Sequence, residues 1–484
     1  MKKNTLIVLT NTIFEESTED ISNFSIDEII IVYDKLYFHK GQHKQKLALW
    51  IACADEYKEW LLSNFKDIKV ISVREYKGED IHLSKSNSYY MYKSLDKTVH
   101  AKYLAVSKQG ANLTFITNKS MILSEDEMEE ARSSLIKKKN TSSRINIRHS
   151  DFYRYMRLKK NILMKNGQPE GGIWSYDQAN RQKFSPSYTE MDINGYVNKT
   201  ANKAIDTVNK EFSNAIGSCE ELYYPSSFSS AKEALDKFIK FRLKDFGKYQ
   251  DAISSTVVFG EHANISAIMN IGLITPDYVV DRILHYYSSL DKKKEEYIAS
   301  VEGILRQIIG WREYMRFVYH FFEKEINSSE YLEKIECLGT GKIHKSWYNG
   351  TTGIFLFDNL IQKILKTGYA HHIERLMIIN NAMIMYGFSR KEIYKWFMSM
   401  FVDSYDWVMN GCVSMNHNSL NDRVRYMSRV YLAGDNYIKK MSDYRDKDSM
   451  EVMKNLFKSF AKKHSSTLKS DYNMASYIAR HVKN

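Results

Sequence analysis

Cysteine and proline are scarce in this sequence of 484 residues, which contains only four of each. The four cysteines are scattered with no C-x-x-C spacing, which argues against a disulfide scaffold and against a zinc or iron–sulphur site. No apolar run approaches the roughly 20 residues that a membrane span requires. Lys2 and Lys3 precede a short apolar stretch that is typical of a first strand rather than of a signal peptide. We therefore expect an intracellular, soluble protein with reduced thiols and no membrane partner.

Acidic residues are outnumbered by basic ones, 58 against 70, which gives a formal net charge of +12. This balance favours a polyanionic partner such as nucleic acid, although many proteins carry such a charge only for solubility. The composition is 43% hydrophobic and 13% aromatic, as in globular proteins, and the length predicts two or three domains.

A Gly-x-Gly-x-x-Gly turn is also missing after the first strand-like run, so a standard dinucleotide site is not supported. The N-terminal part nevertheless has the pattern of alternating strands and helices. Apolar, mostly β-branched runs predict strands at 5–9, 28–33, 69–73 and 113–116, and a helical pattern covers 47–65. This order predicts a parallel, Rossmann-like α/β domain over residues 1–130.

Residues 131–200 are predicted to be an interdomain linker. From Met128 to Lys165 the chain is basic, and aromatic residues lie between the charges. Such a run is either a solvated surface or a strip that faces phosphates, and the sequence leaves both readings open. The basic residues are Lys137, Lys138, Lys139, Arg144, Arg148, Arg154, Arg157, Lys159 and Lys160.

Strand patterns are absent after about residue 200, so residues 201–484 are predicted to form a large all-helical domain. Apolar residues recur with the helical period from Ser300 to Glu325 and place Gln307, Gly310 and Trp311 on one face. Glycine costs about 1 kcal/mol inside a helix, so we expect a backbone or a ligand to approach closely there. The polar groups of this helix and of segment 368–377 (GYAHHIERLM) do not suit an apolar core and indicate a ligand.

Five segments match one known family in sequence and in order. They are 171–181 (GGIWSYDQANR), 306–314 (RQIIGWREY), 369–372 (YAHH), 403–408 (DSYDWV) and 437–444 (YIKKMSDY). At these segments the chain resembles the cryptochrome/photolyase family, and specifically its bacterial branch of (6-4) photolyases that carry an iron–sulphur cluster. The resemblance spans nearly the whole chain. It implies the photolyase fold, with an N-terminal α/β antenna domain, a linker and a helical domain that binds FAD.

The resemblance also implies a reaction and a partner. In this family, light-excited reduced flavin passes an electron to a pyrimidine dimer in UV-damaged DNA, and the lesion rearranges or splits. The leading hypothesis is therefore a monomeric enzyme that repairs (6-4) photoproducts, with cyclobutane dimers as the nearest alternative substrate. A cryptochrome-like photoreceptor without repair and a flavin-free nucleic-acid-binding protein are alternatives of other classes.

Candidate site residues follow from the resemblance, position by position. Arg375 and Asp403 match a pair beside the isoalloxazine ring, and buried charges are tolerable only when they are partnered. The other positions expected to bind the cofactor are His262, Gln307, Asn381 and Cys412. The positions expected at the lesion are Asp177, Arg181, Trp311 and Glu313, together with Tyr431 and Tyr437, which we count as catalytic.

His371 and His372 match the paired histidines that this branch places at the lesion. Adjacent helical residues point about 100° apart, so the two cannot form a metal-binding pair, which needs i and i+4 spacing. From the residues alone, each is more often a satisfied core histidine. The resemblance makes both catalytic candidates, with His372 as the general acid, because histidine changes charge near working pH.

Flavin re-reduction is expected to run through Trp396, which matches the inner tryptophan of the family's electron-transfer chain. Phe397 stands where relatives carry tyrosine. Tyr348 stands where they carry the outer tryptophan, with Trp347 one residue away. Aromatic residues at helical spacing often only fill a core. We therefore expect photoreduction to be slower or rerouted.

Several positions depart from the family pattern. Leu356, Arg445 and Asp448 stand at three cluster-cysteine positions, and no cysteine follows Cys412, so we predict no iron–sulphur cluster and no other metal. Leu36 replaces the glutamate that holds a lumazine antenna, which argues against antenna binding, although 42–46 (QHKQK) is retained. Near the flavin, Met409 replaces a glutamate. Cys412 stands by the reactive edge of the ring, where a thiol would alter the stable redox state.

Overall fold

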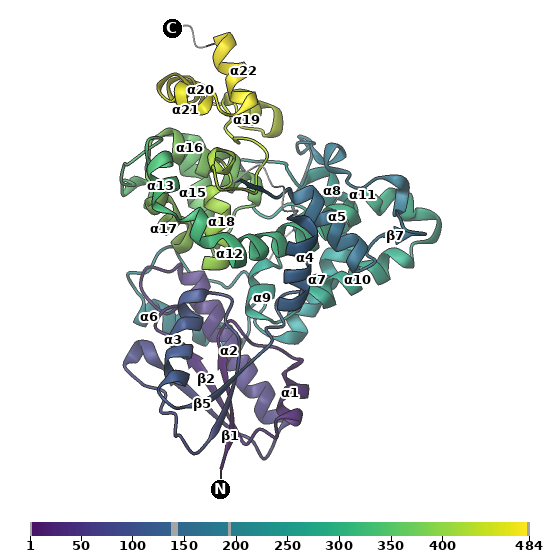
Figure 1. Ribbon diagram of the computed structural model, residues 1–484, viewed down its shortest axis with the longest axis vertical. Helices are drawn as coiled ribbons and strands as arrows, with labels where there is room; N and C mark the ends of the chain where they lie inside the picture. The colour runs from purple at the N-terminus through teal and green to yellow at the C-terminus, as the bar shows by residue number, and fades with distance from the viewer. Residues whose placement is uncertain (1, 137–143, 192–194, 482–484) are drawn as a thin grey trace.

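The computed structural model describes residues 2–136, 144–191 and 195–481. An α/β half that contains the N-terminus lies at one end of the molecule, and the helices of the C-terminal segment lie at the other (Figure 1). The remaining helices fill the region between them. The predicted Lys137-Lys138-Lys139 part of the basic strip lies outside the described residues.

The α/β half is built on a parallel sheet of five strands in the order β3-β2-β1-β4-β5. The register pairs Leu6 with Ile29 on one side and with Tyr90 on the other. The predicted parallel α/β architecture is confirmed, but the aromatic strand Ser88–Tyr92 was not predicted, because it lacks a β-branched run. The strands are β1 (Asn4–Leu9), β2 (Glu28–Tyr33), β3 (Lys69–Arg74), β4 (Ser88–Tyr92) and β5 (Asn112–Ile116).

The helices between consecutive strands connect them, whereas the last helix, Glu125–Leu135, follows β5 and packs against the helix His149–Lys159. Helix α2 begins after His43, whose Nδ1 accepts the backbone N–H of Gln45, and it is buried along most of its first three turns. The elements are α1 (Ser17–Asn23), α2 (Lys44–Asn64), η1 (Glu75–Lys77), α3 (Lys97–Lys108) and α4 (Glu125–Leu135).

The predicted linker packs against the helical half, and the helix that begins at its end packs against the α/β half. Strand β6 pairs in parallel with β9, and helix α5 packs against the helical half, whereas α6 packs along α2 of the α/β half. Helix α6, which the sequence analysis placed in the helical domain, thus packs on the α/β half, and β9 is a short strand in a region expected to be all helix. These elements are β6 (Ile145–Asn146), α5 (His149–Lys159), β7 (Met164–Lys165), β8 (Gln168–Pro169), η2 (Glu170–Gly172), η3 (Asp177–Asn180), α6 (Lys199–Glu211) and β9 (Val424–Arg425).

The helical half has one buried apolar cluster of its own, shares a second with the α/β half, and surrounds the site described below. Its elements are α7 (Phe228–Phe241), α8 (Leu243–Tyr249), α9 (Ser266–Ile271), α10 (Pro276–Ser288), η4 (Asp291–Lys293), α11 (Lys294–Leu305), η5 (Arg306–Arg312), α12 (Glu313–Ile326), α13 (Ser329–Glu336), α14 (Ser346–Asn349), α15 (Phe355–Thr367), η6 (Glu374–Asn380), α16 (Asn381–Met385), α17 (Arg390–Met400), α18 (Asp406–Ser414), η7 (Asn418–Leu420), α19 (Asp435–Met441), α20 (Lys447–Lys463), α21 (Ser465–Leu468) and α22 (Tyr472–His481). None of the helices within the described ranges is long and apolar enough to cross a membrane.

The predicted helix over 300–325 is present as α11, η5 and α12 in direct succession, and η5 is a π-helical segment. A Cβ at Gly310 would lie 2.9 Å from Nε2 of His149 and 3.2 Å from Cδ2 of Tyr153. The close approach expected at Gly310 is thus made by the side chains of α5. Because π-helical turns often occur at functional sites, η5 directs attention to the space beside it.

Candidate active site

A cavity of about 850 Å³ opens in the helical half beside η5. Its walls come from α5, η5, the loop that leads into α9, the turn before η6, helix α18 and the segment before α19. Segments distant in the sequence therefore meet here. Twelve of the predicted site residues line the cavity: Asp177, Arg181, His262, Gln307, Trp311, His371, His372, Arg375, Asp403, Cys412, Tyr431 and Tyr437.

Arg375 and Asp403 form a two-point ion pair on this wall. The Nη1–Oδ1 and Nη2–Oδ2 distances are 2.8 and 3.2 Å. Nε of Arg375 also donates to the carbonyl of Ala370, and the hydroxyl of Ser266 donates to Asp403. Burial by itself would raise the pKa of Asp403, but Arg375 and Ser266 hold it below its usual value. The pair is therefore charged at neutral pH, as the sequence predicted.

Two further buried atoms on the wall call for a ligand. Nε2 of His262 and Oδ1 of Asn264 have no hydrogen-bond partner among the described residues. Buried polar atoms are nearly always paired, so both fit a polar ligand. Burial raises the pKa of the Cys412 thiol to about 12, so this group stays protonated. The ion pair, these atoms and the cavity volume fit the FAD that the resemblance implies.

The two predicted histidines have different surroundings. His371 is buried and its ring stacks on that of His262, with centroids 4.9 Å apart. Burial, followed by His262 and His372, holds the pKa of His371 well below its usual value, so His371 is neutral. The side chain of His372 is 39% exposed, and its Nε2 lies 3.4 Å from Oδ1 of Asp251. His372 is therefore accessible to solvent and lies beside a carboxylate.

An arginine that the sequence analysis missed completes the predicted pair of Asp177 and Arg181. Nη1 of Arg306 lies 3.2 Å from Oδ1 of Asp177, and Nη2 of Arg181 donates to Oδ2. Burial would raise the pKa of Asp177, but Arg306 and Arg181 together lower it. Arg306 is the first residue of η5, so the motif over 306–314 contained it.

Aromatic side chains line another part of the cavity. Trp311 stacks on the ring of His149 with centroids 3.8 Å apart, and the guanidinium of Arg429 lies 4.9 Å from the ring of Tyr431. Burial raises the pKa of Tyr437, so its phenol remains a donor. The sequence analysis did not identify His149, because it lies in the predicted linker. The close approach expected at Gly310 was the signal that could have led to His149.

The substrate role predicted for Glu313 is not supported by its position. Its carboxylate is buried away from the cavity lining and accepts the backbone N–H groups of Ile122 and Leu123. Residues two apart on a helix face different directions, so Glu313 cannot share the wall that Trp311 forms. Glu313 instead anchors the segment that leads out of the α/β half.

Asn381 and the predicted electron-transfer residues also lie behind the wall. The Asn381 amide donates to the carbonyls of Met377 and Ala433. Trp396 is buried behind Phe397, which lines the cavity; the ring centroids are 5.4 Å apart. The indole of Trp396 donates to the carbonyl of Trp347. Tyr348 is half-buried and packs against the apolar cluster that contains Trp347 and Trp396.

The α/β half holds the segment that follows Asp403. Nζ of Lys46, on α2, donates to the carbonyl and to the hydroxyl of Ser404, the latter at 2.9 Å. Trp50 donates to the hydroxyl of Tyr405 at 2.7 Å, and the backbone N–H of Trp407 donates to the carboxylate of Asp96. The position of Asp403 in the cavity thus depends on contacts from both halves.

Comparison with known proteins identifies the scaffold. Residues 12–224 match the family model described as deoxyribodipyrimidine photo-lyase-related protein, and residues 304–445 match the FAD binding domain of DNA photolyase. The chain belongs to the cryptochrome/photolyase family. The Arg375–Asp403 pair, His371 and His372 lie in the second matched region, whereas His262 lies between the two matched regions.

Relatives in this family are about a quarter to a third identical to the chain over the parts that match. A (6-4) photolyase of Agrobacterium fabrum is 32% identical over 297 residues, which cover 61% of this chain and 56% of the relative. A deoxyribodipyrimidine photo-lyase of Alkalihalophilus pseudofirmus is 24% identical over 231 residues, which cover 46% of this chain and 45% of the relative. The matched part therefore spans about half the length of each relative.

Solved structures of photolyases and cryptochromes share the fold. A bacterial class III photolyase from Agrobacterium tumefaciens has a TM-score of 0.58 at 13% identity and covers 100% of this chain and 92% of its own. A Synechocystis cryptochrome has a TM-score of 0.58 at 12% identity, with 98% and 89% covered. The predicted photolyase fold is confirmed.

Two of the residues that the sequence analysis matched to cluster cysteines make other contacts. Leu356 is buried in an apolar cluster, and its backbone N–H donates to the hydroxyl of Ser449 on α20. Arg445 donates to the carbonyls of Ser442 and Tyr444. Within the described ranges, no group of three or more His, Cys, Asp or Glu side chains is arranged to hold a metal ion.

Proposed function

We propose that this chain is a light-driven DNA repair enzyme that binds FAD and acts on (6-4) photoproducts. One observation carries the proposal: the Arg375–Asp403 ion pair and the His371–His372 pair line the same cavity. A cofactor held by the first pair would lie next to a substrate held near the second. FAD, when bound and reduced, supplies an electron to the substrate on illumination.

The flavin end of the cavity is built to hold charge in a fixed place. Arg375 and Asp403 present a cation and an anion that are already paired, so binding needs no rearrangement of either group. Gln307 and the free nitrogen of His262 add neutral polar contacts on the same wall. The remainder of the wall is mainly apolar, which would help to exclude water once the cofactor is bound.

Proton transfer is assigned to His372. A (6-4) lesion differs from a cyclobutane dimer in that its repair requires a proton to move, which gives a general acid a task. His372 is partly exposed and lies beside Asp251, whereas His371 is buried and held neutral. His372 therefore donates the proton. His371 orients the ring of His372 through edge-on packing, with the two ring centroids 6.0 Å apart.

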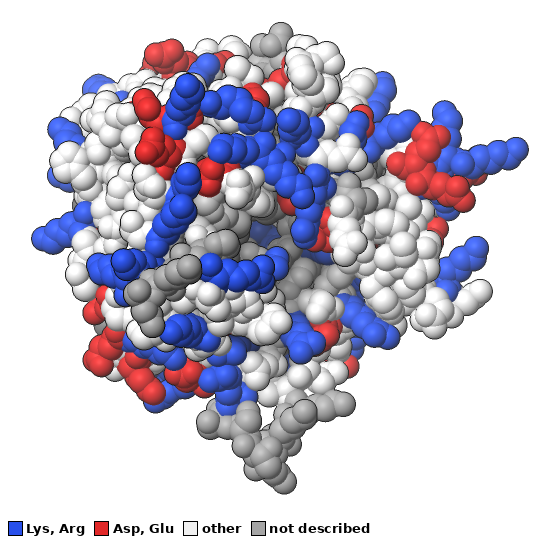
Figure 2. Space-filling model, turned by 90° about the horizontal axis from the view of Figure 1, so that it is seen from above, with Lys and Arg blue, Asp and Glu red and all other residues white. Residues whose placement is uncertain are grey.

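The substrate would reach this cavity as two adjacent, covalently joined pyrimidines of one strand that are turned out of the duplex. Lys and Arg side chains gather around a hollow on the face seen from above (Figure 2). Arg154, Arg181 and Arg429 belong to the cavity lining itself. Neutralisation of phosphates by such a surface supplies affinity that falls with salt, and unstacking costs least at a damaged pair.

The direct test uses an oligonucleotide that carries one defined lesion, blue light and the reduced protein. The wild type is expected to repair the (6-4) lesion to normal pyrimidines. His372→Ala is expected to lose this activity while its flavin content stays unchanged. Full activity of His372→Ala would exclude the proton-donor role. If the wild type repaired only a cyclobutane dimer, that dimer would be the substrate instead of the (6-4) lesion. Flavin photochemistry without repair of either lesion would favour the photoreceptor.

A further inference from the structure

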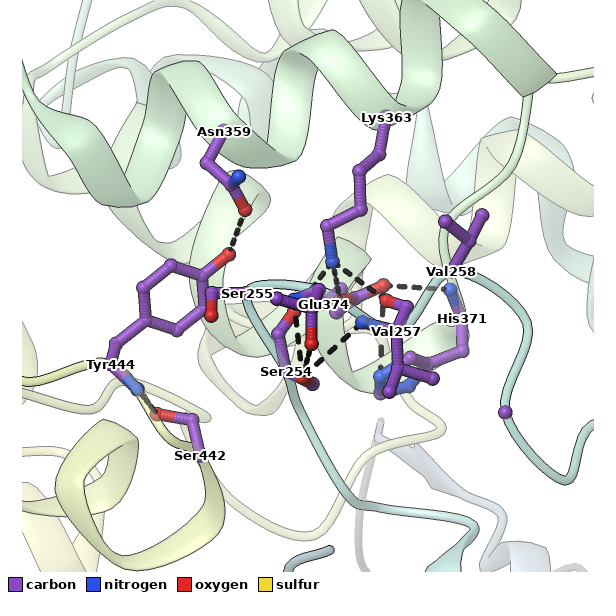
Figure 3. A network of polar contacts seen from close by, with 12 residues as sticks. Ser254, Ser255, Val257, Val258, Asn359, Lys363, His371, Glu374, Ser442 and Tyr444 are labelled. Carbon is purple, nitrogen blue, oxygen red and sulfur yellow. Dashed lines mark hydrogen bonds and ion pairs between the residues drawn. The ribbon is translucent and has the colours of Figure 1, made fainter. Parts of the chain in front are cut away.

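A polar network outside the cavity lining extends from Lys363 to His371 (Figure 3). Its centre is Lys363 on α15, whose side chain is 11% exposed. Nζ of Lys363 donates to the carbonyls of Ser254 and Val257 at 2.5 and 3.0 Å and lies 3.4 Å from Oε1 of Glu374. An ammonium group has three hydrogens, so these contacts use all of them.

One arm of this network leads to His371. Oε2 of Glu374 accepts the backbone N–H of His371 at 3.3 Å and lies 3.6 Å from its Nε2. The carboxylate is almost fully buried, and burial raises the pKa of Glu374 while Lys363 opposes the rise. A buried carboxylate is tolerable only with such a partner. Lys363 thus stabilises the anion that contacts His371.

The other arm leads to His372. Ser254 and Val257 belong to a loop that also contains Asp251, the carboxylate 3.4 Å from His372. Asp443 also accepts the Ser254 hydroxyl at 2.8 Å and the backbone N–H of Ser255 at 2.7 Å. The loop is therefore held by both Lys363 and Asp443. These contacts fix its backbone a few residues beyond Asp251.

We propose that Lys363 is a positioning residue for both histidines: it holds Glu374 against His371 and the Asp251 loop against His372. The inference rests on the proposed function, because it assigns Lys363 a part in the proton transfer. Lys363 itself touches neither substrate nor cofactor. It acts from behind the wall, through two carboxylates that each contact one histidine.

The test needs a variant that folds without Lys363. Lys363→Met alone leaves Glu374 buried and unpaired, so the double variant Lys363→Met/Glu374→Gln removes both charges together. Lys366→Met is the matched control, because it removes an exposed lysine from the same helix. Each protein is compared in its flavin-loaded form for restoration of the (6-4) oligonucleotide, DNA affinity and rate of flavin photoreduction.

The double variant is expected to lose roughly 100-fold in restoration rate, the size of effect that a displacement of about 1 Å has on reacting groups. DNA affinity and photoreduction should stay within about twofold of the wild type, because the ion pair at the flavin end is untouched. Histidine ring ¹⁵N signals of His371 and His372 should shift, and amide exchange in 250–257 should quicken. Lys366→Met should match the wild type in every measurement.

Two results would overturn the assignment of Lys363. One is a folded double variant with unchanged ring signals and unchanged exchange in 250–257. The other is an equal fall in restoration, DNA affinity and photoreduction, which would show a general structural role. If the wild type restores no lesion, the proposed function fails instead, and the ring signals and exchange still decide whether Lys363 positions the histidines.

Discussion

The ion pair of Arg375 and Asp403 is the residue-scale feature on which cofactor binding depends. Asp403→Asn would leave Arg375 buried without a counter-charge and remove an acceptor from the cavity wall. Hydrogen bonds to charged groups contribute about 1.5–3 kcal/mol, so FAD should bind roughly 10- to 100-fold more weakly. The ratio of flavin to protein absorbance after purification measures this loss.

Asp406→Asn is the control for that substitution. Asp406 is a nearby carboxylate that accepts the hydroxyls of Tyr319 and Tyr394 and lies outside the cavity lining. Its loss should weaken packing and leave the absorbance ratio close to that of the wild type. Equal ratios in the wild type and in Asp403→Asn would remove Asp403 from the cofactor site.

Residues that stand in a motif could be predicted, and residues that act through the fold could not. His371, His372 and Arg375 lie within one short segment whose polar groups conflict with an apolar helix, so the sequence singled them out. Asp251 and Lys363 lie in segments without such a conflict. Their roles follow from contacts over about 10 to 120 positions of the chain, which a single sequence does not reveal.

At the scale of elements, the contact of η5 with α5 sets one wall of the cavity. Gly310→Ala places a methyl group 2.9 Å from His149, so the side chains of α5 must move. Overpacking of this kind costs about 1–3 kcal/mol, measured as a lower free energy of unfolding in urea. Trp311, which stacks on His149, should report the shift through its fluorescence.

The double variant Gly310→Ala/His149→Ala provides the check on this prediction. Removing the imidazole vacates the space that the methyl group needs, so the two changes should be non-additive, and the second should cost less in the presence of the first. Strict additivity would show that the strain at Gly310 has another source.

Periodicity predicted the long helix over 300–325 but not the π-helical segment inside it. A π-turn adds a residue to one turn, and the apolar pattern on either side keeps its usual spacing. The linker helix α5 was not predicted because its basic residues obscured its apolar positions, Phe152 and Met156, which are fully buried. Charge was the stronger signal there, and packing overrode it.

At the scale of the whole molecule, the α/β half takes part in holding the flavin site. Lys46→Met removes the two bonds to Ser404, next to Asp403, without altering the cavity lining. It should therefore lower FAD occupancy and speed the loss of FAD on dilution. Fluorescence of released flavin measures this rate, and Lys44→Met, which removes a lysine from the same helix, is the control.

An unchanged rate of flavin release in Lys46→Met would show that Ser404 is held well enough by its own half. Ser404 does donate there, to the carbonyls of Met398 and Phe401. The outcome thus shows whether the turn at Ser404 is held by local hydrogen bonds alone or also needs the contacts from the α/β half.

The contacts of α2 with the residues after Asp403 give the α/β half a structural role that does not depend on an antenna chromophore. A version trimmed to its helices would keep every side chain that lines the cavity and still lose the outer support of one of them. Even without an antenna, α2 and Asp96 support the chain that follows Asp403 and so help to form the flavin pocket.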